Sequence, residues 1–148
     1  MRPRNLSVKP IGFVRKGRIV LNRPWVKGLR GLEGFSHLLV FTWLHQAHKT
    51  DLLLKPKKGL PPIGFLATRT PHRPNPIGFT VVKLVKRRGA NLEVRGLDAR
   101  EGTAILDLKP YTPREQLKGI RIPSWVEKLD RLENDPLRRY GAQLKNLL

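Results

Sequence analysis

The sequence contains no cysteine, and this absence removes several classes of function. Without thiols there is no disulfide framework, no cysteine-ligated zinc site and no cysteine nucleophile. Long apolar runs are also missing, because the longest, Leu38–Leu44, is far short of the roughly 20 residues that span a bilayer. The basic N-terminus lacks a following hydrophobic region, which argues against a signal peptide. We therefore expect a cytoplasmic protein.

Acidic residues are scarce in the first part of the chain. Residues 1–90 carry 2 Asp and Glu against 19 Lys and Arg, whereas residues 91–148 carry 9 against 11. The formal net charge is +19, and solubility alone would not segregate such an excess. The uneven charge favours a nucleic acid partner, whose phosphates Lys and Arg neutralise. An anionic membrane surface is a weaker alternative, since the cations lie among prolines and strand-like segments rather than along one amphipathic helix.

Two kinds of ligand site lack support in the sequence. There is no glycine-rich dinucleotide fingerprint and no Walker loop. His45, His48 and Asp51 follow one another at three-residue spacing, which could place metal ligands along one helix. No second ligand cluster accompanies them, so we expect no metal site.

Short apolar or alternating segments recur between turns along most of the chain. Turns are predicted at Arg15–Gly17, Lys86–Asn91 and Asp98–Thr103. This pattern indicates a mainly β protein, a small antiparallel barrel or sandwich, and 148 residues suit one compact core. The strands that we expect are Val8–Val14, Ile19–Leu21, Leu38–Leu44, Ile63–Thr68, Phe79–Val85, Leu92–Leu97 and Ala104–Leu108. The segment Leu44–Leu53 is predicted as a short helix or an irregular excursion.

The end of the chain has a different pattern. Ser124 can cap a helix with Glu127 three residues on, and Asp135 with Pro136 can start a second helix. We therefore divide the chain into a β-domain over residues 1–113 and a short helical tail over residues 114–148. The tail is expected to pack on the barrel or on a dimer partner.

A proline-rich stretch after the strand predicted to end at Thr68 is typical of a binding loop. Pro71, Pro74 and Pro76 exclude a helix and restrict the backbone to extended conformations. Such a loop has little conformational entropy left to lose when it binds a ligand. Its polar side chains are Arg69, His72, Arg73 and Asn75. We expect Arg73 and Asn75 to contact a nucleic acid.

A second polar cluster ends the last predicted strand. Asp107, Lys109 and Tyr111 alternate, so they share one face if the strand continues past Pro110. One interpretation is structural, with Asp107 and Lys109 simply forming a pair. The other is functional, because a carboxylate, a cation and a stacking ring can recognise an unpaired RNA base.

Several of these blocks together resemble the TsaA-like (TrmO) family. The resemblance runs from Ile11 to about Pro113. It rests on Gly31–His37 leading into His45-Gln46, on Ala67–Arg69, on Arg73–Gly78, on Asp98 with Gly102-Thr103, and on Asp107–Tyr111. The family implies a β-barrel tRNA methyltransferase that uses S-adenosylmethionine and is usually a homodimer. Its implied substrate is N6-threonylcarbamoyl-adenosine next to the anticodon, which gains a methyl group on N6.

The resemblance also assigns roles to residues. It implies a cofactor pocket made by His45, Gln46, Arg69, Phe79, Arg95, Gly96, Leu97 and Asp98. For the tRNA substrate we expect Arg73, Asn75, Lys109 and Tyr111, and the candidates for a catalytic role are Asp107, Lys109 and Tyr111. One departure is that Arg15–Arg30 has no clear counterpart of a cofactor-contacting segment found there in the family. The alternative from another class is a non-catalytic, basic RNA-binding module that needs no S-adenosylmethionine.

Overall fold

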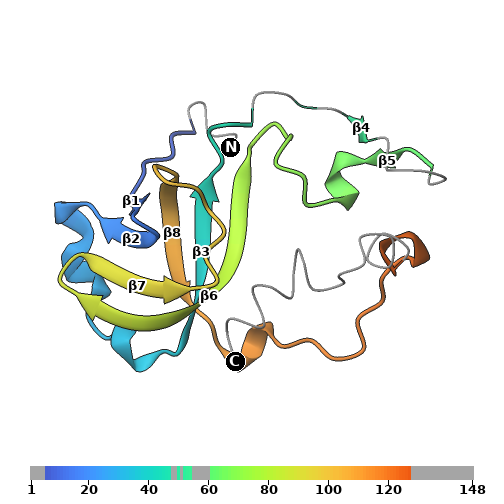
Figure 1. The fold of residues 1–148 in the computed structure, drawn as a ribbon. Helices are drawn as coiled ribbons and strands as arrows, with labels where there is room; N and C mark the ends of the chain where they lie inside the picture. Colours follow the sequence, from blue (N-terminus) through green and yellow to red (C-terminus); the bar gives the residue numbers. More distant parts are fainter. Residues whose placement is uncertain (1–5, 48–49, 51, 55–60, 128–148) are drawn as a thin grey trace.

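The computed structural model describes residues 6–47, 50, 52–54 and 61–127, and a closed antiparallel barrel forms its centre. The strands follow one another around the barrel in the order β1-β2-β7-β6-β3-β8 (Figure 1). Their bounds are β1 Gly12–Arg15, β2 Arg18–Leu21, β3 His37–Trp43, β6 Ile77–Arg88, β7 Asn91–Arg95 and β8 Ala104–Pro110. The predicted mainly β barrel is therefore confirmed.

The core lies inside the barrel, where strand alternation sends every second side chain. Leu38 and Val40 of β3, Val82 of β6, Leu92 of β7 and Ile105 of β8 are each fully buried. Neighbouring positions on the same strands point outward, so the barrel wall is also the surface that carries candidate site residues.

Several strand boundaries differ from the predicted ones, and two of the differences matter here. The first strand begins at Gly12 rather than Val8. The turn predicted at Lys86–Asn91 is shorter than expected, because β6 continues to Arg88 and the chain reverses at Gly89, whose φ is +58°. Since a single glycine at positive φ is enough for a tight hairpin, the basic residues before it belong to the strand.

Two 3₁₀ helices that the sequence analysis missed follow β2. They are η1, Arg23–Leu29, with a proline in its first turn, and η2, Leu32–Gly34. Leu29 is buried and joins the hydrophobic core of the barrel. The segment between β2 and β3 thus covers part of the barrel with a short helical connection.

A small arm stands beside the barrel (Figure 1). It contains the two-stranded sheet of β4, Leu53–Leu54, with β5, Ile63–Gly64, followed by the 3₁₀ helix η3, Phe65–Ala67. The predicted strand Ile63–Thr68 is wrong beyond Gly64. The Thr68 amide and hydroxyl both donate to the Phe65 carbonyl, at 3.1 and 2.8 Å, and close a helical turn there.

After β8 the chain runs from the foot of the barrel toward the arm (Figure 1). It forms η4, Pro113–Glu115, and residues 124–127 are helical, as Ser124 and Glu127 predicted. The second expected helix, starting at Pro136, lies outside the described residues. Within the part of the chain that the structure describes, no helix is long and apolar enough to cross a membrane.

Candidate functional site

The outer face of β8, β3 and β6 carries polar and aromatic side chains in rows. Directly opposed residues of antiparallel strands point to the same side. Asp107, Phe41 and Phe79 form one row across the three strands, and Lys109, Leu39 and Val81 form the next. A β-bulge between Phe41 and Thr42 separates these rows from the register at the start of β8. The residues Asp107, Lys109 and Phe79, which are far apart in the sequence, are thus brought to one surface.

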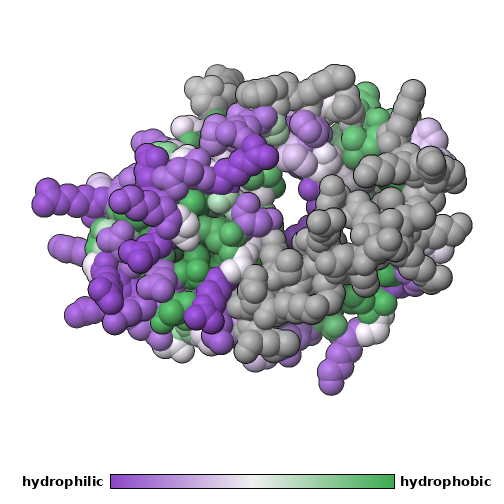
Figure 2. Space-filling model, viewed as in Figure 1, coloured by the Kyte–Doolittle hydropathy of each residue, from purple (hydrophilic) through white to green (hydrophobic). Residues whose placement is uncertain are grey.

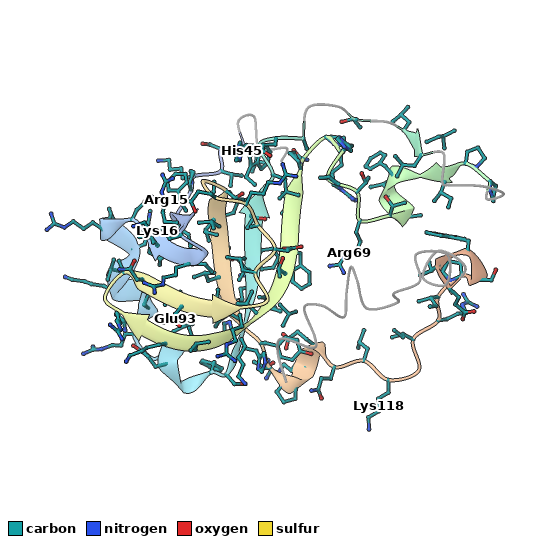
Figure 3. The ribbon with its side chains drawn as sticks, viewed as in Figure 1. Arg15, Lys16, His45, Arg69, Glu93 and Lys118 are labelled. Atoms are coloured by element: carbon teal, nitrogen blue, oxygen red, sulfur yellow. The ribbon has the colours of Figure 1, made fainter. Side chains whose placement is uncertain are left out.

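An aromatic pair with a cation above it dominates the first row. The Phe41 and Phe79 ring centroids are 5.5 Å apart, with the rings tilted by 52°. The Arg69 guanidinium carbon lies 5.6 Å from the Phe79 centroid, within the range of a cation–π contact. Arg69 reaches this position from the loop on the arm side of β6 (Figure 3). Phe79 is still 43% exposed, so part of its ring faces solvent beside the Arg69 guanidinium.

Asp107 and Lys109 form an ion pair on this face. Lys109 Nζ lies 2.9 Å from Asp107 Oδ2, and Asp107 Oδ1 accepts from the Leu108 amide at 2.9 Å. The structural interpretation, that the two side chains pair, is therefore confirmed. The lysine can still donate two further N–H groups to a ligand.

Tyr111 lies just past the end of β8. The strand stops at Pro110, but the Tyr111 amide donates to the His37 carbonyl at 3.0 Å and continues the ladder with β3. Tyr111 is half-buried. Its register position places it on the same face as Asp107 and Lys109, as the alternation predicted.

A second group of polar residues lies where β3 ends and β6 begins. The Thr80 hydroxyl donates to Asp98 Oδ1 at 2.8 Å, and Thr80 is buried whereas Asp98 is exposed. Arg100 Nη1 donates to Gln46 Oε1 at 2.7 Å. His45 sits in the exposed turn after β3 (Figure 3). A carboxylate of the β7–β8 connection and an amide of the turn after β3 are thus each oriented by a hydrogen bond.

A family model described as the tRNA-methyltransferase O N-terminal domain matches residues 6–116. The chain belongs to this family. The match covers the whole barrel and the arm, so the resemblance noted from the sequence is confirmed.

Individual relatives agree with the family assignment. The chain is 45% identical over 101 residues to a probable S-adenosyl-L-methionine-binding protein of Archaeoglobus fulgidus, covering 68% of this chain and 28% of that one. It is 41% identical over 98 residues to the mouse tRNA (adenine(37)-N6)-methyltransferase, covering 62% and 22% of the two chains. The crystal structure of TrmO from Pseudomonas aeruginosa superposes with a TM-score of 0.64 at 27% identity, covering 97% and 80%. Several curated relatives are longer, since the chain spans 28 to 61% of their length.

The remaining residues expected in the family's cofactor pocket lie at the end of β7. Arg95 is exposed and opposite Lys83 of β6, on the outer face of the sheet. Gly96 has φ +89°, which ends the strand, and Leu97 packs against the core. Arg95 can therefore reach a ligand with its side chain, whereas Gly96 and Leu97 can do so mainly through the backbone.

The proline-rich loop is braced by one of its own arginines. Arg73 Nη1 donates to the carbonyls of Thr68 and Thr70, at 3.1 and 3.0 Å, and its guanidinium carbon lies 5.5 Å from the Phe65 ring centroid. Asn75 is exposed, and its carbonyl accepts from the Ile77 amide. Arg73 therefore stabilises the conformation of the loop. The expected contacts of Arg73 and Asn75 with RNA stay predictions.

Three residues of the site were missed by sequence reasoning. Thr80 and Arg100 hold Asp98 and Gln46, and Phe41 pairs with Phe79. Phe41 and Thr80 were counted only as strand residues, and Arg100 only as part of a turn. Their roles depend on partners that the strand register brings together, so no local signal could identify them.

The possible metal ligands His45, His48 and Asp51 cannot be compared as a group, because His48 and Asp51 lie outside the described residues. Among the residues that are described, no group of three or more His, Asp or Glu side chains could hold a metal ion.

Proposed function

We propose that this protein is an S-adenosylmethionine-dependent tRNA methyltransferase that adds a methyl group to N6 of threonylcarbamoyl-adenosine next to the anticodon. The family assignment supports this proposal, as do the relative named for S-adenosylmethionine binding and the mouse relative named for adenine-37 N6 methylation. The observation that carries it is the cation–π contact of Arg69 with the exposed Phe79 ring; Asp98 and Gln46 are each oriented by a hydrogen bond, from Thr80 and from Arg100.

These side chains suit the chemistry of S-adenosylmethionine. A guanidinium such as Arg69 binds a carboxylate with paired hydrogen bonds, as the methionine end of the cofactor requires. The exposed ring of Phe79 can pack against an adenine or a sulfonium. The Asp98 carboxylate, which Thr80 orients, can accept hydrogen bonds from ribose hydroxyls or an ammonium group. When bound, the cofactor would supply an electrophilic methyl group.

The row of Asp107, Lys109 and Tyr111 suits the other substrate. Because Asp107 fixes Lys109 at 2.9 Å, the ammonium is positioned for the carboxylate of the threonylcarbamoyl group or for a phosphate. The Tyr111 ring can stack on the target base. A methyl transfer of this kind depends on alignment more than on a strong base, so these residues would contribute mainly by orienting N6.

Calorimetry with purified protein tests the cofactor site. We expect S-adenosylmethionine binding in the wild type and a strong loss of affinity in Arg69→Ala. Arg18→Ala serves as the matched control, because Arg18 is an exposed arginine on β2, a different part of the barrel. An Arg69→Ala protein that keeps wild-type affinity would remove Arg69 from the pocket.

Mass spectrometry of nucleosides tests the reaction itself. Protein and cofactor are incubated with tRNA that carries threonylcarbamoyl-adenosine and with the same tRNA lacking it. We expect N6 methylation of the modified tRNA, and Tyr111→Ala should lower methylation while cofactor affinity changes little. Binding of tRNA without cofactor binding or methylation would instead support the RNA-binding module.

Two further parts of the proposal follow from the family rather than from the geometry. We propose a homodimer and action in the cytoplasm. Light scattering on the same preparation reports the molar mass, and a single-chain mass would contradict the dimer.

A further inference from the structure

Near its C-terminal end, β6 directs an arginine side chain, that of Arg87, to the face of the strand that carries core residues. The register with β7 shifts between Leu84 and Lys86, so a β-bulge occupies this part of the strand. After the bulge, Arg87 stands opposite the buried Leu92. Without the shift, strand alternation would put Lys86 on that side. The bulge therefore turns the Arg87 side chain toward the barrel side of the hairpin.

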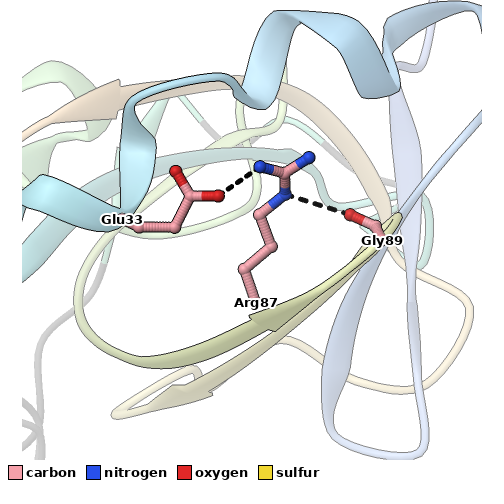
Figure 4. A network of polar contacts seen from close by, with 3 residues as sticks. All are labelled: Glu33, Arg87 and Gly89. Carbon is pink, nitrogen blue, oxygen red and sulfur yellow. Dashed lines mark hydrogen bonds and ion pairs between the residues drawn. The ribbon is translucent and has the colours of Figure 1, made fainter.

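Arg87 is held in place by two acceptors. Its Nε donates to the Gly89 carbonyl at 3.1 Å, and its Nη1 donates to the Glu33 carboxylate of η2 (Figure 4). Hydrogen bonds from its own backbone and from Arg87 hold the pKa of the Glu33 carboxyl below its usual range, so Glu33 is ionised at neutral pH. Nη2 makes no hydrogen bond to any of the described residues. A guanidinium fixed at one edge keeps its other edge ready for an anion without losing further rotamer freedom.

Two more cations surround the same space. Lys27, Arg30, Gly31, Glu33 and Arg87 line a hollow of about 560 Å³, which we call the η1 hollow. Lys27 and Arg30 are exposed, and no carboxylate of the described residues pairs with either of them. Figure 2 shows hydrophilic side chains gathered on this end of the barrel, around η1 and the β6–β7 hairpin. The Arg87–Glu33 pair alone could be a structural tie for η2, but that role does not explain the two unpaired cations.

We propose that the η1 hollow binds backbone phosphates of the RNA substrate. A phosphate accepts hydrogen bonds from a guanidinium edge and from lysine, and here three cations face one carboxylate. The hollow and the candidate site lie toward opposite ends of β6. The strand distance from Phe79 to Arg87 is at most about 26 Å, at roughly 3.3 Å per residue. The RNA would therefore place its target base at one end of β6 and be positioned by its backbone at the other.

This inference rests on the proposed action on tRNA, so its test is a binding measurement that needs no cofactor. The affinity for tRNA is measured against salt concentration for Lys27→Gln/Arg30→Gln and for the matched control Lys118→Gln/Arg121→Gln, which removes two exposed cations from the segment after η4. We expect the first variant to bind about tenfold more weakly. Its slope of log affinity against log salt should fall by about 0.7 for each lost contact. The control should stay within about twofold of the wild type.

Arg87 and Glu33 separate phosphate binding from a purely structural tie. We expect Arg87→Gln to weaken tRNA binding and Glu33→Gln to strengthen it, because the second change removes the only negative charge of the hollow. If the pair only ties η2 to the hairpin, both variants lose thermal stability and neither changes tRNA affinity. Circular dichroism confirms that each variant is folded before binding is compared.

The outcomes also separate this inference from the proposed function. Equal losses in the two double variants would overturn the η1 hollow as a phosphate site. The inference would also be overturned if Lys27→Gln/Arg30→Gln bound tRNA as the wild type does but no longer bound anionic phosphatidylserine vesicles. That result would assign the hollow to a membrane surface. If Lys27→Gln/Arg30→Gln weakens tRNA binding but the wild-type protein never methylates tRNA, the η1 hollow is supported as a phosphate site and the proposed methyltransferase activity is contradicted.

Discussion

Gly78 illustrates how a single residue fixes the geometry next to the candidate site. It faces Thr42 of β3, which is buried, and an added Cβ would lie 2.3 Å from Thr42 Oγ1 and 3.2 Å from a Leu44 methyl. Real Cβ atoms do not approach other atoms so closely. The glycine therefore lets β3 and β6 come together immediately before Phe79.

The first prediction concerns this contact. Gly78→Ala should lower the free energy of unfolding by about 1–3 kcal/mol, because the added methyl overpacks the β3–β6 contact. Urea denaturation measures the change. Gly64→Ala is the control, since an added Cβ there meets nothing within 4 Å. A loss of equal size in both variants would show that glycine content, and not the contact with Thr42, sets the stability.

At the residue scale, sequence reasoning succeeded where the chemistry is local. Strand alternation put Asp107 and Lys109 on one face, with an ion pair as one of two interpretations, and the structure shows that ion pair. The partners of Gln46 and Asp98 could not be found in this way. Arg100 is 54 residues from Gln46, and Thr80 is 18 from Asp98, so each contact exists only once the barrel is folded.

At the scale of elements, η4 is defined by a capping box. The Thr112 hydroxyl accepts from the Arg114 amide, while the Glu115 carboxylate accepts from the Thr112 amide at 2.7 Å and from its hydroxyl at 2.9 Å. This arrangement satisfies backbone groups that the start of a helix leaves open. It marks the point where β8 ends and the tail begins.

The second prediction follows from the charge of that cap. Hydrogen bonds from the Thr112 side chain and then its backbone amide hold the pKa of Glu115 below 4.5. The cap therefore stabilises the folded state above about pH 4.5 and loses this effect as the pH falls through the lowered pKa. In Thr112→Ala the pKa of Glu115 should rise toward 4.5, as carboxyl NMR titration can measure, while that of Glu33 stays unchanged. A Glu115 pKa unaffected by the substitution would mean that the hydroxyl does not set it.

Element types were easier to predict than their ends. The expected strands Ile19–Leu21, Leu38–Leu44 and Phe79–Val85 correspond to β2, β3 and β6, because short segments rich in apolar and β-branched residues between turns favour strands. The bulge near Lys86 was not predictable, since a bulge is defined against the partner strand rather than along its own. This error matters for function, because the bulge is what turns Arg87 toward the η1 hollow.

At the scale of the whole molecule, the sequence predicted the barrel and the family but not the surfaces. Composition and turn spacing indicated antiparallel β structure, and the ordered motif blocks narrowed it to the observed fold. The excess of positive charge in residues 1–90 was visible from the sequence. The meeting of Lys27, Arg30 and Arg87 at one hollow was not, because η1, η2 and β6 come together there only after folding.

The closing of the barrel has a consequence for its motions. The β1–β2 hairpin joins its neighbours through short ladders, Gly12–Ile105 and Phe13–Ala104 on one side and Ile19–Leu92 and Val20–Asn91 on the other, whereas β3 is paired along its length on both sides. Local opening begins where the fewest interactions must break, so amide hydrogens of β2 that bond to the β7 side should exchange with deuterium faster than those of β3. Equal exchange rates would mean that the barrel opens only when the whole molecule unfolds. Faster exchange in β2 would show that the barrel opens locally at the β1–β2 hairpin. The sheet of β6, β3 and β8 and its outer surface would then stay intact.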